Sequence, residues 1–195
     1  MPRYKSLDPN KYILIRNAAI ELFYEQGIDN TSISQIAAKA GIAKGTIYLY
    51  FKDREELVAN IFNYCFEMHM KASVKDVELH TSCSDKLKKR VKNILQWNID
   101  FPKESSIIST YYSPVNISGT ENVSFAKSYE ANKAFIEDGV KNGEFKVLPI
   151  EFLCSIFFSS VEGISKYIKK NPAVIHDDEL LEKMLESVVD GIRLI

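Results

Sequence analysis

Basic and hydroxyl-bearing side chains gather in residues 31–54, which read TSISQIAAKAGIAKGTIYLYFKDR. Four basic residues and a single acid, Asp53, give this stretch a net charge of +3, and the rest of the chain carries −4. Ammonium, guanidinium and hydroxyl groups bind DNA phosphates and base edges. The composition of the stretch therefore predicts contact with nucleic acid.

The same stretch has the pattern of two short helices joined by a tight turn. Ser32 and Gln35 have the spacing of a capping box, so a helix is predicted to begin there. Gly41 permits a left-handed backbone, and the neighbouring Ile42 can fill the space between the helices. A further helix is predicted over residues 44–50. Helix, turn and helix form a helix-turn-helix, whose second helix enters the major groove of DNA.

This motif resembles the DNA-binding motif of the TetR family of bacterial transcriptional regulators. The matching residues are Phe23, Gly27, Thr31–Ile33, Ile36, Ala37, Ala40–Ile42, Lys44–Tyr48, Tyr50–Asp53 and Leu57. The resemblance covers residues 12–60 in detail. It implies a homodimer that places its N-terminal domains in successive major grooves of a palindromic operator. It also implies a helical body that binds a small-molecule effector.

The resemblance assigns a DNA contact to particular side chains. The side chains expected to hold phosphates are Ser32, Ser34, Tyr48, Tyr50 and Arg54, and Tyr48 can instead touch a thymine methyl. The predicted DNA-binding residues are Ser32, Ser34, Ala43, Lys44, Gly45, Thr46, Tyr48, Leu49, Tyr50 and Arg54. Ala43 replaces a serine that many members carry, and Leu49 can make only apolar contacts. Base readout therefore rests on Lys44 and Thr46. The tyrosines could alternatively be core residues, and for Phe51 that interpretation is preferred.

Helical periodicity extends over the whole chain of 195 residues. Apolar residues recur at helical spacing in 9–26, 84–101, 124–142, 150–170 and from 177 onward, and no run alternates as a strand would. The predicted fold is all-α with about nine helices. A helix-turn-helix DNA-binding domain is expected in residues 1–53, and a larger helical effector-binding and dimerisation domain in 54–195.

The predicted body is rich in aromatic side chains. The candidate ligand-binding residues are Phe62, Phe66, Trp97, Phe101, Tyr111, Tyr112, Phe125, Tyr129 and Phe158, with Phe157 beside the last of them. Rings on several helices can line an apolar pocket or fill a solid core. The residues alone do not distinguish a pocket from a solid core, and only the resemblance favours a pocket. The effector's identity stays unknown.

The last two predicted helices each carry an apolar stripe. One stripe is Leu153, Phe157, Val161, Ile164 and Ile168, and the other is Leu181, Met184, Leu185, Val188 and Ile192. Two such helices from each subunit can form a four-helix bundle across a two-fold axis. We expect a homodimer through these stripes; the alternative is that they pack within the monomer.

Several classes of function lack their motifs. The chain has no glycine-rich phosphate loop, no HExxH and no GxSxG, so neither enzyme activity nor a cofactor is expected. His80 and Cys83 are too few for a metal site. Three cysteines without a CxxC pair, and no run of about 20 apolar residues, suggest a cytoplasmic protein without a membrane span.

The predicted function is that of a ligand-responsive regulator, a repressor that an effector releases from its operator. The alternatives are a carrier or enzyme that uses the aromatic pocket, and a protein-interaction module.

Overall fold

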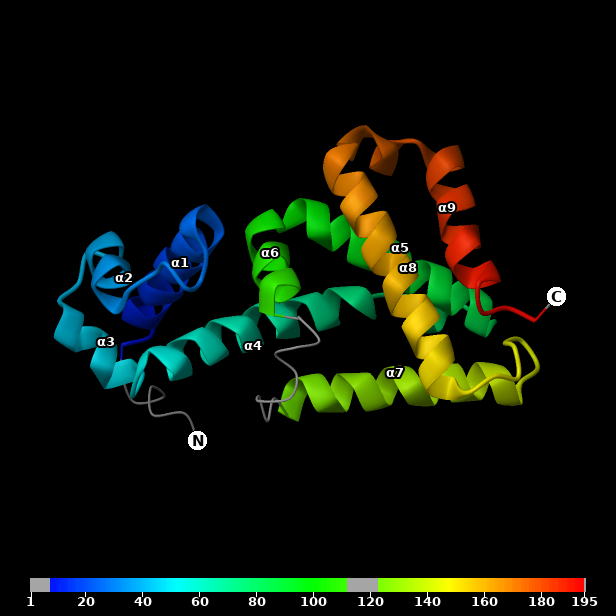
Figure 1. Ribbon diagram of the computed structural model, residues 1–195, viewed down its shortest axis with the longest axis horizontal. Coiled ribbons are helices and arrows are strands. Elements are labelled where there is room, and N and C mark those ends of the chain that lie inside the picture. The colour runs from blue at the N-terminus through cyan, green and yellow to red at the C-terminus, as the bar shows by residue number, and fades with distance from the viewer. Residues whose placement is uncertain (1–7, 112–122, 195) are drawn as a thin grey trace. The chain divides into compact units, whose positions relative to one another are not determined.

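A computed structural model describes residues 8–111 and 123–194, with side chains for 8–110 and 128–194. Within these residues nine α-helices form, and the one β-type pairing is an isolated bridge between Phe145 and Arg193 (Figure 1). The all-α prediction is confirmed. The chain divides into two compact units, Met1–Glu67 with Pro102–Thr120, and Met68–Phe101 with Glu121–Ile195. None of the described helices is long and apolar enough to cross a membrane.

The first unit contains α1 (Pro9–Gln26), α2 (Ile33–Lys39), α3 (Lys44–Tyr50), the first part of α4 (Arg54–Ser73) and α6 (Pro102–Tyr111). The Asp8 carboxylate accepts the N–H of Asn10 at 2.9 Å, and Pro9 occupies the first turn, where its missing N–H costs nothing. The buried face of α1 packs on the other helices of this unit, with a core that includes Ile15, Ala19, Phe23, Ile36, Ile47, Leu57 and Ile61.

The helix-turn-helix forms as the sequence predicts. The Ser32 hydroxyl accepts the N–H of Gln35 at 3.3 Å, and the Gln35 side chain accepts the N–H of Ser32 at 2.8 Å. Gly41 has φ +67°, which lets the N–H of Ile42 donate to the Ala37 carbonyl at 3.0 Å. The side chain of Ile42 packs against the core of the unit. This closed turn fixes where α3 begins.

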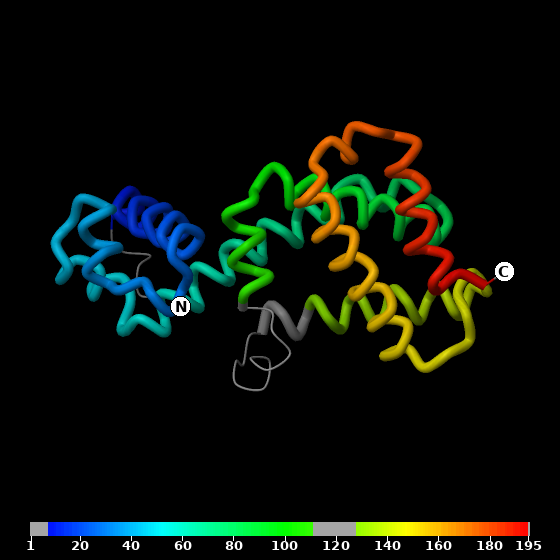
Figure 2. The backbone as a smooth tube through the Cα atoms, turned by 45° about the horizontal axis from the view of Figure 1, so that its top comes forward, coloured from blue at the N-terminus to red at the C-terminus, as the bar shows by residue number. Residues whose placement is uncertain are grey.

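The second unit contains the end of α4, the 3₁₀ helices η2 (Val77–Leu79) and η3 (Pro172–His176), and α5 (Cys83–Asp100), α7 (Val123–Lys141), α8 (Ile150–Lys170) and α9 (Asp178–Asp190). Figure 2 shows α8 and α9, orange and red, side by side and joined through η3. Both helices also pack on α5.

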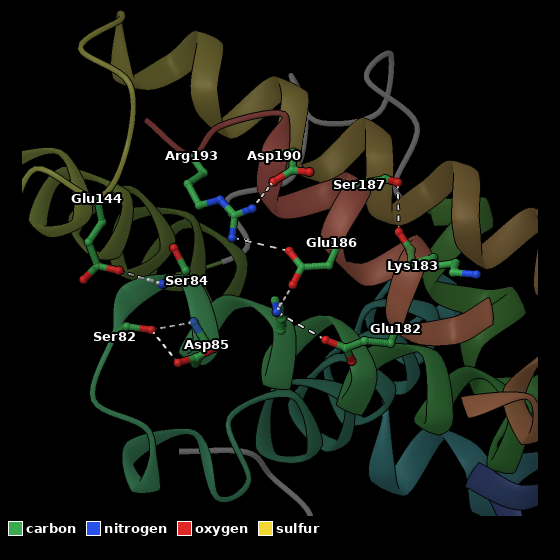
Figure 3. A network of polar contacts seen from close by, with 11 residues as sticks. Ser82, Ser84, Asp85, Glu144, Glu182, Lys183, Glu186, Ser187, Asp190 and Arg193 are labelled. Carbon is green, nitrogen blue, oxygen red and sulfur yellow. Dashed lines mark hydrogen bonds and ion pairs between the residues drawn. The ribbon is translucent and has the colours of Figure 1, made fainter. Parts of the chain in front are cut away.

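Polar contacts tie the N-terminal half of α5 to neighbouring segments of this unit (Figure 3). The Glu144 carboxylate accepts the N–H groups of Cys83 at 2.8 Å and Ser84 at 3.0 Å. Burial opposes the charge of Glu144, but these hydrogen bonds prevail and lower its pKa. On the other side, Lys88 pairs with Glu182 at 3.2 Å and with Glu186. These contacts fix α5 against α9 and the segment after α7.

The apolar stripes of α8 and α9 pack inside the second unit. Leu153, Phe157, Val161 and Ile168 are buried in the core of the second unit, as are Leu181, Leu185, Val188 and Ile192; Ile164 and Met184 pack against that core. These side chains are therefore covered by their own chain, and a homodimer through the last two helices stays a prediction for other faces of α8 and α9. The alternative interpretation, packing within the monomer, holds for these side chains because they meet each other and α5.

Candidate nucleic-acid interface

Helix α3 is held by one face and exposes the other. Ile47 and Tyr50, three residues apart, are buried and anchor the helix. Lys44 and Gly45 are exposed at its start, Tyr48 is 46% exposed and Leu49 is 57% exposed. Thr46 is half-buried between the two faces. The exposed side therefore presents a cation, a phenol and an apolar side chain on one turn and a half of helix.

Tyr50 does not belong to this exposed face. Its side chain is 2% exposed, and its hydroxyl donates to the backbone carbonyl of Asp8 at 2.9 Å. Burial and the nearby Asp8 carboxylate raise the pKa of the phenol. The predicted DNA contact of Tyr50 is wrong, since its position three residues after Ile47 turns it into the core. Phe51 is buried too, as preferred from its type.

Arg54 is engaged within the first unit. Its Nε donates to the Thr31 carbonyl at 3.1 Å, and a second guanidinium nitrogen donates to the Ile28 carbonyl. Both acceptors lie in the loop between α1 and α2. This guanidinium joins the start of α4 to the loop that precedes α2, and its expected phosphate contact stays a prediction. Arg54 is thus a positioning residue for the helix-turn-helix.

The remaining predicted contacts are exposed. Ser32 and Ser34 lie on the surface at the start of α2, and the hydroxyl of Ser32 takes part in the capping box. Ala43 precedes α3 and provides no side-chain hydrogen bond to its first turn. Beyond its own turn of helix, an added Cβ at Gly45 would meet no atom of the described residues within 4 Å. The backbone at the start of α3 is therefore open to an approaching molecule.

The basic side chains differ in how far their charge is compensated. Lys39 forms ion pairs at 3.1 Å with Glu21 and with Glu25 of α1, and the hydrogen bonds to these carboxylates raise its pKa. Lys52 is 3.7 Å from Asp53, whereas Lys44 forms no ion pair with any described residue. The count of charges in residues 31–54 did not include the acidic partners of Lys39. Glu21 and Glu25 lie one helical turn apart, so both carboxylates are on the same side of α1.

The aromatic candidates fall into both units. Phe62 and Phe66 are buried and stacked at 5.7 Å in the first unit. In the second unit, Trp97 stacks on Phe101 at 5.7 Å. Phe158 packs against Phe157 at 5.3 Å, and Tyr129 is half-buried. Tyr112 lies outside the described residues, and Tyr111 and Phe125 lie outside the described side chains.

Comparison with known proteins supports the assignment of the helix-turn-helix as a DNA-binding motif. The model of "Bacterial regulatory proteins, tetR family" matches residues 15–61. A fatty acid metabolism regulator protein of Bacillus subtilis strain 168 is 35% identical over 77 residues, which make up 40% of each chain. The match thus spans less than half the length of this relative.

Solved structures extend the likeness to the whole fold. A TetR family transcription regulator from Marinobacter aquaeolei VT8 matches with a TM-score of 0.82 and 19% identity, over 97% of this chain and 98% of the other. The transcriptional regulator FadR from Bacillus subtilis, in complex with stearoyl-CoA, matches with a TM-score of 0.71 and 24% identity, over 93% and 99%. Residues 15–61 therefore match the tetR family of bacterial regulatory proteins by sequence, and the chain as a whole shares the fold of TetR-family regulators.

Proposed function

We propose that the chain is a transcriptional regulator of bacterial DNA, acting in the cytoplasm, which binds a palindromic operator as a homodimer and leaves it when a small molecule binds. The exposed face of α3 carries this proposal. Its one uncompensated lysine, Lys44, lies at the start of a helix that two buried side chains fix to the core. Such a helix can enter a major groove without giving up its own packing.

Each exposed residue then has a role that its chemistry allows. Lys44 and Thr46 reach base edges, and Leu49 covers an apolar patch such as a thymine methyl. The hydroxyls of Ser32, Ser34 and Tyr48 hold phosphates. Ala43 and Gly45 are small, which lets the backbone come close to the duplex. We assign this DNA-binding role to residues 1–53, and effector binding and dimerisation to residues 54–195.

The homodimer is proposed to use the outward side of α8 rather than its apolar stripe. Ser155, Ser159 and Gly163 recur on that exposed side at intervals of four residues, between the exposed rings of Phe152 and Tyr167. Small side chains let two helices approach closely, and aromatic rings at both ends can anchor them. A two-fold axis through this face would bring two identical surfaces together.

Helix α4 is the proposed route from effector to DNA. It starts at Arg54, which holds the loop before α2, and it continues to Ser73 among residues of the second unit. An effector acts only through the difference between its affinities for the DNA-binding and the released form. Because the FadR structure holds stearoyl-CoA, we propose an effector with a fatty chain.

Selection of bound duplexes from a random DNA pool tests the proposal directly. Enrichment of a palindrome is the expected result, and no enrichment would favour the carrier or protein-interaction alternatives. The selected duplex then serves to compare Lys44→Ala with Lys39→Ala. The first removes an uncompensated charge and should weaken binding and lower the salt slope by about 1. The second removes a charge already paired with Glu21 and Glu25, so its salt slope should stay unchanged.

A further inference from the structure

A buried arginine in the second unit lacks a counterion. Arg90 of α5 is 8% exposed and donates one guanidinium hydrogen bond to the side-chain carbonyl of Asn132 of α7. Its Nε has no partner, and no described carboxylate forms an ion pair with it. Burial of a guanidinium without an anion is expensive, so groups of this kind are normally paired. The site therefore lacks one negative charge.

A second polar group nearby is also incomplete. The Nδ1 atom of His69, on α4, is buried and has no hydrogen-bond partner. Burial, and then the charge of Arg90, lower the pKa of His69 to about 4, so the ring is neutral near pH 7. Its ring and that of Trp97 of α5 form an edge-to-face pair, with ring centroids 4.9 Å apart. Arg90 and His69 thus offer an anion one positive charge and one further polar atom.

Aromatic rings lie beside both of these groups. The guanidinium carbon of Arg90 lies 5.5 Å from the ring centre of Phe135 on α7, and the ring of His69 contacts that of Trp97. Low polarity strengthens an ion pair once it forms. A ligand held here would keep its charged end on Arg90 and its apolar part among rings.

We propose that Arg90 and His69 recognise the carboxylate of an organic monoanion with an apolar body, and that this anion is the effector. The inference rests on the proposed function and names the effector's chemical class. A planar guanidinium pairs well with a carboxylate, and the neutral His69 supplies a second hydrogen bond. One cation compensates one negative charge. A phosphate dianion would leave a charge uncompensated, so the site favours a carboxylate over a phosphate ester.

Trp97 is the single tryptophan of the chain and reports on this site. The DNA-free protein is titrated with sodium decanoate and sodium benzoate, and in parallel with decan-1-ol and benzyl alcohol, while Trp97 emission and Tm are followed. At least one carboxylate should bind tenfold or more tightly than its alcohol. If neither carboxylate exceeds its alcohol, the proposal is overturned.

Arg90→Met assigns the effect to this residue, and Arg193→Met, at a half-buried arginine paired with Glu186 and Asp190, is the matched control. Arg90→Met should weaken the carboxylate tenfold or more and leave the alcohol unchanged, whereas Arg193→Met should change neither. The Tm of ligand-free Arg90→Met should equal or exceed that of the parent protein, since this variant removes an unpaired charge. Equal carboxylate affinity in Arg90→Met and the parent protein overturns the proposal.

A second variant and a measurement of operator binding distinguish failure of this inference from failure of the proposed function. If Arg90→Met does not fold, Arg90→Lys gives the same comparison, because lysine keeps the charge but not the planar pair of donors. Operator binding is measured separately with and without the carboxylate. Binding through Arg90 that leaves operator affinity unchanged would refute the coupling in the proposed function and overturn the effector role.

Discussion

Two tyrosines of α3, two residues apart, should respond in opposite ways to the same small change. Removing the hydroxyl of Tyr50 as Tyr50→Phe deletes its 2.9 Å hydrogen bond to the Asp8 carbonyl and keeps the buried ring. A neutral hydrogen bond contributes about 0.5–1.5 kcal/mol net. Because Asp8 is exposed, water can replace the lost donor. We therefore expect a loss near the lower end, about 1 kcal/mol or less in the free energy of unfolding.

Tyr48→Phe removes the same atom from an exposed ring. No packing is lost there, so the free energy of unfolding should stay within about 0.5 kcal/mol of the parent value. A hydrogen bond to a charged group such as a phosphate is worth about 1.5–3 kcal/mol. Operator affinity should accordingly fall by about tenfold or more, with little change in salt slope, since the phenol carries no charge.

Denaturant titration and fluorescence anisotropy on the selected operator separate the two effects. Both variants are compared at one protein concentration, because dimerisation makes apparent stability depend on it. The assignment predicts a stability loss with unchanged DNA affinity for Tyr50→Phe, and the reverse for Tyr48→Phe. A weakened operator complex in a fully stable Tyr50→Phe protein would refute the placement of Tyr50 in the core.

Further predictions concern the second unit. The pKa of His69, about 4, lies below its ordinary value of 6.5, so the folded state rejects a proton that the unfolded state takes up. Stability should therefore fall by up to about 3 kcal/mol as pH drops from 6.5 towards 4, and His69→Gln should flatten this part of a pH series of denaturant titrations. Gly139→Ala would place a Cβ 2.1 Å from Cδ2 of the buried Phe145 and should cost about 1–3 kcal/mol, measured by the same titration. An added Cβ at Gly163 would meet no atom of the described residues within 4 Å, outside its own turn of α8. Gly163→Ala should therefore stabilise α8 by up to about 1 kcal/mol. The same variant should weaken dimerisation in sedimentation experiments, and unchanged dimerisation would contradict the proposed interface.

Short-range sequence signals were enough to predict the helix-turn-helix. The capping box of Ser32 and Gln35 and the left-handed Gly41 depend on neighbours within a few residues, so the sequence contains all that decides them. The burial of Tyr50 was also readable, because it lies three residues after Ile47 on the same side of α3. The partners of Arg54 were not readable. They are backbone carbonyls more than 20 residues away, and only the folded unit brings them together.

Periodicity shows which side of a helix is apolar but not what covers it. The stripes of α8 and α9 fitted both a second subunit and the chain's own core, and the core is where they lie. Arg90 presents the converse case. It follows Leu87 by three residues and precedes Val91, so it occupies the buried side of α5, although arginine is a residue type found mostly at the surface.

The contacts of α4 explain why an effector's influence need not be lost before it reaches DNA. A helix can transmit a displacement along its length, because its backbone hydrogen bonds join each turn to the next. His69 and Arg54 lie on this one helix, and Arg54 is attached through two hydrogen bonds to the loop before α2. In the proposed mechanism, a ligand that repositions His69 displaces that loop with α4, and the capped turn then carries α3 along. The proposed base readout by Lys44 and Thr46 is compatible with this mechanism, since a small displacement would weaken an affinity that depends on few contacts in each of two proposed subunits.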